Sequence, residues 1–215
     1  MDSYEVFINE LGISFDEFID FGINNTIYPD FQMVKEFWKE LKSRIENGEP
    51  VYIRGLGRNG GGNELIKEFY AFFGINIIID PSNNMVPTRN LQKFTGKTKN
   101  KNLFNYQVAH IFGKTKNVYM FESPWNICFV PKMFDPLTGH EAKGIFPDKY
   151  KEKWLAAVKE KYQEFIADFN SVVESFNIKE KLEVFTSNEN IKAKYGEKLL
   201  QGFIRDLLNE FAPIN

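Results

Sequence analysis

Histidine occurs only twice in this chain of 215 residues, at His110 and His140. Both lie in one window of about 30 residues, with Asn126 between them. A neutral imidazole can accept a proton from water, and a second imidazole can bind a divalent cation. An amide oxygen can bind the same cation or orient the base, so the three residues have the chemistry for metal-assisted hydrolysis of a phosphodiester bond.

The elements around these residues can be predicted from local patterns. YQVAHIF (106–112) predicts a strand, and WNICFVPK (125–132) predicts a second one. Thr138 and Glu141 have the spacing of a capping box, so we expect a short helix that begins at Thr138 and carries His140 in its first turn. The predicted order is strand, loop, strand, helix.

The segments AHI, PWNI and GHEAK in this window resemble the motif of the HNH, or His-Me finger, nucleases. The resemblance implies a ββα-metal finger over residues 106–144 and a metal-dependent endonuclease that binds DNA. It implies His110 as the general base, His140 as a metal ligand and Asn126 as the middle residue of the motif. The paired zinc cysteines that brace many such fingers are absent, since Cys128 is the single cysteine.

The carboxylates of this window leave two routes open. Many HNH members place an acidic metal ligand before the first histidine, where this chain has Ala109. Glu122, Asp135 or Glu141 would then complete the shell of a Mg²⁺ or Mn²⁺ ion, or water and phosphate oxygens would fill those places. Asp135, Glu141 and Lys143 also imitate the D…E-x-K set that binds Mg²⁺ in another nuclease class. Both routes lead to the same reaction.

Positive charge collects beside the histidine window. Residues 81–121 contain no Asp or Glu and carry seven Lys or Arg, so this segment is +7 and the remainder must be −9 for a net charge of −2. A basic face beside a hydrolytic centre favours a polyanionic substrate, which the resemblance implies is double-stranded DNA, whereas a solvated lysine-rich loop is the alternative. The predicted DNA-contacting residues are Arg54, Arg58, Arg89, Lys93, Lys97, Lys99, Lys114, Lys116 and Lys143.

A glycine-rich loop supports a different class of function. GLGRNG (55–60) fits G-x-G-x-x-G, follows a predicted strand (50–54) and precedes a predicted helix (63–74), and Asp80 ends the next predicted strand. This is the context of a dinucleotide-binding βαβ unit, so an oxidoreductase that binds NAD or FAD is the alternative. A loop that wraps a DNA backbone without catalysis is a third possibility.

The rest of the chain predicts helices. Apolar spacing indicates helices within 1–49, with Ser14 as an N-cap, and long helices within 148–215, whereas residues 81–105 predict loops with at most a short helix at 89–95. The fold class is α+β: a ββα-metal finger embedded in a mostly helical single domain, 1–215, whose 22 Phe predict an aromatic core.

The absence of a leader-like N-terminus and of any apolar run of ~20 residues predicts a cytoplasmic protein without a membrane partner. A type II restriction-like enzyme of this size is expected to act as a homodimer.

Overall fold

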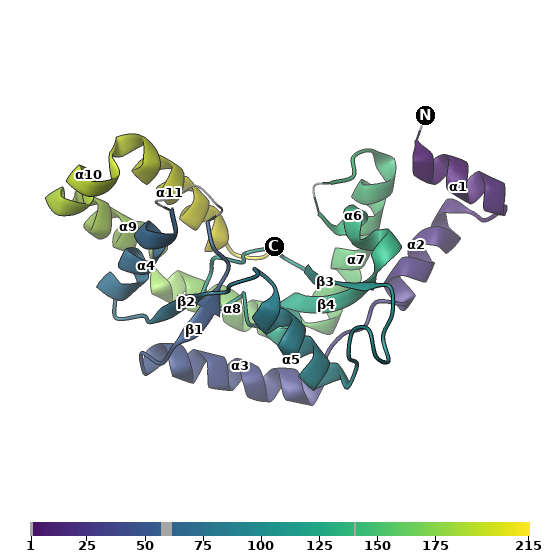
Figure 1. The fold of residues 1–215 in the computed structure, drawn as a ribbon, viewed down its shortest axis with the longest axis horizontal. Helices are drawn as coiled ribbons and strands as arrows, with labels where there is room; N and C mark the ends of the chain where they lie inside the picture. The colour runs from purple at the N-terminus through teal and green to yellow at the C-terminus, as the bar shows by residue number, and fades with distance from the viewer. Residues whose placement is uncertain (1, 57–61, 140) are drawn as a thin grey trace.

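The computed structural model describes residues 2–56, 62–139 and 141–215. Two arms rise from a common base (Figure 1). One arm holds the strands and helix of residues 51–79 and the helices of residues 178–210, and the other holds the helices of residues 3–24 and 135–161. A hairpin formed by residues 106–110 and 127–131 lies between the arms, above three base helices at residues 31–46, 85–95 and 163–176.

Three helices form the N-terminal part, as predicted. Side chains of Asp2, Ser14 and Asp30 accept hydrogen bonds from the first-turn N–H groups of these helices, and Ser14 forms a full capping box. The helices are α1 (Ser3–Leu11), α2 (Phe15–Asn24) and α3 (Phe31–Glu46).

A small βαβ unit follows. Strand β1 (Val51–Ile53) pairs in parallel with β2 (Ile77–Ile79), and α4 (Gly62–Phe72) connects them. This arrangement confirms the predicted strand, helix and strand. Helix α5 (Met85–Thr95) begins earlier than the predicted 89–95, because the Asp80 carboxylate accepts hydrogen bonds from the backbone N–H groups at its start.

The histidine window contains an antiparallel hairpin. Strand β3 (Tyr106–His110) pairs with β4 (Ile127–Pro131), and His110 lies opposite Ile127. Short 3₁₀ turns flank β4: η1 (Pro124–Asn126) precedes it and η2 (Lys132–Phe134) follows it. Helix α6 (Asp135–Thr138) comes next, so strand, strand and helix follow in the expected order.

The predicted helix start at Thr138 was wrong. Helix α6 ends there, and its first turn contains Pro136, whose fixed φ favours that position. The Thr138 hydroxyl donates back to the Asp135 carbonyl instead of capping a new helix. The next helix, α7, begins at Ile145.

Five helices complete the chain where two long helical patterns were predicted. The breaks fall at Tyr162, Asn177, Asn188 and Gly196, and both Asn177 and Gly196 have positive φ angles that a continuous helix excludes. The helices are α7 (Ile145–Lys161), α8 (Gln163–Phe176), α9 (Ile178–Ser187), α10 (Glu189–Tyr195) and α11 (Glu197–Glu210).

One hydrophobic core joins both arms. The main buried cluster includes residues from Ile8 to Ile214, and aromatic rings fill much of it, as predicted. Trp125 is fully buried and packs edge-on against Trp38, with ring centroids 5.6 Å apart. The fold is therefore α+β, with few strands among many helices. No helix in the described part of the chain is both long and apolar enough to cross a membrane.

Candidate active site

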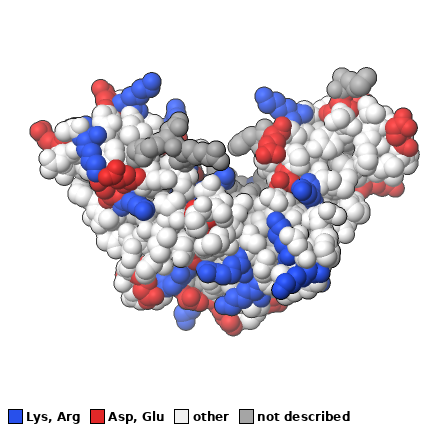
Figure 2. Space-filling model, viewed as in Figure 1, with Lys and Arg blue, Asp and Glu red and all other residues white. Residues whose placement is uncertain are grey.

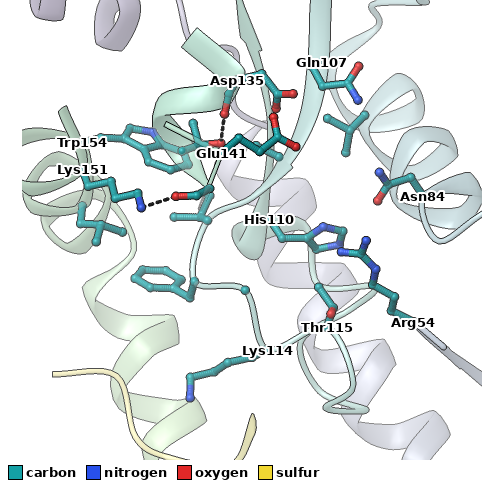
Figure 3. Close-up of a pocket in the computed structure, with 18 of the residues that line it drawn as sticks. Arg54, Asn84, Gln107, His110, Lys114, Thr115, Asp135, Glu141, Lys151 and Trp154 are labelled. Atoms are coloured by element: carbon teal, nitrogen blue, oxygen red, sulfur yellow. Dashed lines mark hydrogen bonds between the residues drawn. The ribbon is translucent and has the colours of Figure 1, made fainter. Parts of the chain in front are cut away.

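A cavity of about 700 Å³ opens between the two arms. Figure 2 shows the hollow in which it lies, and Figure 3 shows the side chains that line it. The lining comes from elements far apart in the sequence: the ends of β1 and β3, the start of α5, the loop after β3, and α6, α7 and α11. Its polar residues include Arg54, Asn84, His110, Asp135 and Glu141.

His110 lies at the end of β3 and lines this cavity. Its ring stacks on Phe121, with centroids 5.4 Å apart, and its Nε2 atom is buried with no hydrogen-bond partner among the described residues. Burial, and then the nearby Arg54 guanidinium, lower the pKa of His110 to about 4, although the Phe121 backbone acts in the opposite direction. His110 is therefore neutral at pH 7, which is the state that accepts a proton.

Arg54 reaches the cavity from the βαβ unit. It follows β1, and its backbone N–H donates to the Thr115 carbonyl, which ties the unit to the loop after β3. The side chain is exposed and forms no ion pair with any described residue. A free guanidinium beside a neutral histidine is suited to an anionic ligand such as a phosphate.

Asp135 and Glu141 form a pair of carboxylates in the cavity wall (Figure 3). Asp135 is half-buried, and its pKa is raised by burial and then by the Glu141 charge, while Lys99 and Lys132 act in the opposite direction. Two close carboxylates suit a hard divalent cation. Across residues 2–56, 62–139 and 141–215, no three His, Cys, Asp or Glu side chains group closely enough for a metal ion. His140, the predicted ligand between these carboxylates, lies outside the described residues.

Asn126 is fully buried and does not line the cavity. Its Oδ1 accepts a hydrogen bond from the Phe112 backbone N–H at 2.9 Å, and its Nδ2 donates to the carbonyls of Gly113 and Met120, both at 3.0 Å. These bonds hold the loop that follows His110. Of the two roles predicted for Asn126, this geometry favours orienting the base over binding the cation.

Two other predicted residues lie away from the His110 cavity. Glu122 is buried, and its carboxylate accepts from the Arg44 guanidinium at 2.9 Å and from the Tyr52 N–H at 2.5 Å. It therefore braces α3 against β1. Lys143 is exposed and lines a smaller surface pocket together with Glu141 and Asp2, so it does not share the lining of the main cavity.

Apart from Arg54, Arg58 and Lys143, the predicted DNA-contacting residues separate into two groups. Lys114 and Lys116 are half-buried and turn towards α11: Lys114 Nζ donates to the carbonyls of Asn209 and Ala212, and Lys116 Nζ lies 3.6 Å from Asp206. The other group stays on the surface of α5 and the loop after it, and none of its members forms an ion pair with a described residue. Together with the neighbouring Lys101, which is not among the predicted contacts, this group forms what we call the basic band: Arg89, Lys93, Lys97, Lys99 and Lys101. Figure 2 shows blue side chains over this face, below the hollow. Arg58 lies outside the described residues.

The glycine-rich segment lies at the end of β1, within the βαβ unit. The parallel unit is present, but residues 57–60 of GLGRNG lie outside the described part of the chain. Asp80, which would hold a ribose in a dinucleotide site, is buried, and it accepts hydrogen bonds from Ser82, Met85 and Val86. That carboxylate is engaged in capping α5.

Some cavity residues gave no signal in the sequence. Asn84, Gln107 and Lys151 line the cavity, and Lys151 donates to the Gly139 carbonyl (Figure 3). Asn84 lies in a stretch that reads only as a turn, and Lys151 lies in a run of helical lysines. The predicted Asp135 and Glu141 do come together with His110.

Comparison with known proteins places the chain in one family. Residues 29–215 match the family described as "Uncharacterised protein PM1201". The chain belongs to this family. A curated protein with the same description, from Pasteurella multocida (strain Pm70), is 45% identical over 188 residues, which cover 86% of each chain. No solved structure matches. The span that matches the PM1201 family includes Arg54, the β3–β4 hairpin and both carboxylates of the cavity wall.

Proposed function

We propose that the protein is a metal-dependent endonuclease that hydrolyses phosphodiester bonds of double-stranded DNA in the cavity between its arms. One observation carries the proposal: a neutral histidine lines a cavity that also holds a pair of carboxylates and an arginine, and neither the histidine Nε2 nor the guanidinium has a hydrogen-bond or ion-pair partner among the described residues. A base, a cation site and an anion site are the three parts that this hydrolysis needs. The resemblance of the window to HNH nucleases supports the same reaction.

Each part has a distinct task in this scheme. His110 removes a proton from the attacking water. Asp135, Glu141 and His140 would hold Mg²⁺ or Mn²⁺, which stabilises the charge that develops on the phosphate and on the leaving oxygen. Asn126 holds the loop behind His110, and Arg54 binds a phosphate oxygen.

The basic band gives the DNA a path to the cavity. Helix α5 begins at the cavity, where Asn84 lines the wall, and its exposed Arg89 and Lys93 lie on the surface that leads away from it. Phosphates of a duplex would follow these side chains. Sequence-specific, restriction-like cutting by a homodimer is part of this proposal, because two copies would cut both strands.

Incubation of supercoiled plasmid with the purified protein tests the function, with EDTA, Mg²⁺ or Mn²⁺. We expect metal-dependent nicking or cutting, and a His110→Ala variant slower by roughly a thousandfold. Lys198→Ala, an exposed change on α11 away from the cavity lining, is the matched control and should cut at the wild-type rate. Failure of the wild-type protein to cut any DNA with either metal would contradict the proposal. Cutting that survives His110→Ala but not Asp135→Ala would replace the histidine base with the D…E-x-K route.

A further inference from the structure

Asn84 has polar atoms that the fold leaves unused. It is the N-cap residue of α5, yet its side chain makes no capping hydrogen bond. Asp80 performs that task through bonds to the N–H groups of Met85 at 3.1 Å and Val86 at 2.8 Å. The Oδ1 atom of Asn84 is buried without a hydrogen-bond partner among the described residues. A buried amide oxygen in this state is costly, so it points to a ligand.

Asn84 and His110 share one cavity. Figure 3 shows the Asn84 carboxamide and the Arg54 guanidinium on the same side of the His110 ring. Nε2 of His110 is buried with no partner among the described residues, so it can accept a hydrogen bond from a ligand when the hydrogen of the neutral ring lies on Nδ1. Among the described residues, Oδ1 of Asn84 and Nε2 of His110 are thus two buried atoms without hydrogen-bond partners, and both side chains line the same cavity as Arg54.

We propose that Asn84 is a further catalytic residue, which holds the attacking water together with His110. This inference rests on the proposed nuclease function and adds a residue from outside the β3–β4 hairpin. A water molecule has two hydrogens, and the two acceptors match them. With both hydrogens engaged, a lone pair of the water oxygen is free to point at a phosphate that Arg54 binds.

The water oxygen forms a bond to phosphorus while the bond from phosphorus to the leaving oxygen breaks. One water proton passes to Nε2 of His110. The other proton, which was hydrogen-bonded to Asn84, stays on the oxygen that is now bonded to phosphorus. The leaving oxygen takes its proton from a solvent water.

Cleavage and DNA binding measured on Asn84→Ala test this role. We expect cleavage to fall by roughly a hundredfold. DNA affinity, measured with Ca²⁺ in place of Mg²⁺, and the melting temperature should stay at wild-type values, because no capping bond is removed. Met85→Ala is the matched control: it changes an exposed side chain in the same turn and should leave cleavage unchanged. Wild-type cleavage by Asn84→Ala would overturn the assignment while leaving the nuclease proposal intact.

A second measurement does not depend on activity. In a His140→Gln background His110 is the only histidine, so its ring can be titrated by ¹⁵N NMR without metal. Asn84→Asp places a carboxylate beside Nε2 and should raise the pKa of His110 by about one unit or more. An unchanged pKa would show that the two side chains do not share a site, and would overturn the assignment. A wild-type protein that cuts no DNA would overturn the nuclease proposal and this step with it.

Discussion

The acid-free stretch of residues 81–121 folds into two halves that use positive charge in opposite ways. The first half, 81–105, keeps Arg89, Lys93, Lys97 and Lys101 exposed on one surface. The second half, 106–121, turns Lys114 and Lys116 inwards, where carbonyls and carboxylates of α11 bind them. Of the seven Lys and Arg in this stretch, the first half thus keeps five near the surface, and the second half uses its two lysines to bind the C-terminal segment.

The largest expected effect concerns His110, which belongs to the inward half. Because its pKa is lowered to about 4, the unfolded chain binds more protons than the folded chain between pH 6.5 and 4. The contribution of neutral His110 to stability is full above pH 6.5 and is lost as the pH falls towards 4. The decrease in stability should reach roughly 3 kcal/mol. Urea unfolding of wild type and His110→Gln at several pH values measures it, as the difference between the two proteins. A difference that does not change with pH would mean that His110 is accessible to solvent.

The next effect concerns the outward half. Replacing Arg89, Lys93, Lys97 and Lys101 together with alanine should weaken DNA binding by roughly a hundredfold. The slope of log affinity against log salt should also become shallower, by about 0.9 for each phosphate that is no longer neutralised. Fluorescence anisotropy with a labelled duplex at several salt concentrations gives both values. The melting temperature should not change, because these side chains form no ion pairs in the described structure. An unchanged salt slope would mean that the basic band is a solvated surface that does not contact DNA phosphates.

The smallest effect separates the halves directly. Lys114→Met removes two hydrogen bonds to the end of α11, so the free energy of unfolding should fall by about 1–2 kcal/mol. Lys97→Met is the matched control, because it removes the same charge from an exposed position and should leave stability unchanged. Equal melting curves for the two variants would show that the inward Lys114 contributes no more to stability than the exposed Lys97.

Much of the fold could be predicted because its signals are local. The N-cap at Ser14, the strand pattern in 106–112 and the strand, turn and helix pattern at 50–80 each depend on neighbouring residues, and each element formed. The missed features depend on partners that are distant in the sequence. The helix start at Thr138 failed because Pro136 favours an earlier turn, and nothing near Lys114 indicates the carbonyls of α11.

In the candidate site, too, some residues could be predicted from the local sequence and others depend on distant partners. His110, Asp135 and Glu141 could be selected by residue type and order, and the fold does bring them to one cavity. Asn84 could not be selected from the sequence. Its side-chain oxygen is left without a capping hydrogen bond because Asp80 caps α5 in its place. The sequence also could not show that Asn126 uses all its polar groups on the loop behind His110.

The hydrogen bonds from Lys114 to the C-terminal segment have a consequence for synthesis of the chain. The loop behind the candidate base is held by carbonyls of Asn209 and Ala212, which the ribosome adds about a hundred residues after Lys114. A nascent chain that stops short of α11 has the hairpin but lacks these bonds. The loop that lines the cavity would then be held in its final position only when α11 and the residues after it have emerged from the exit tunnel.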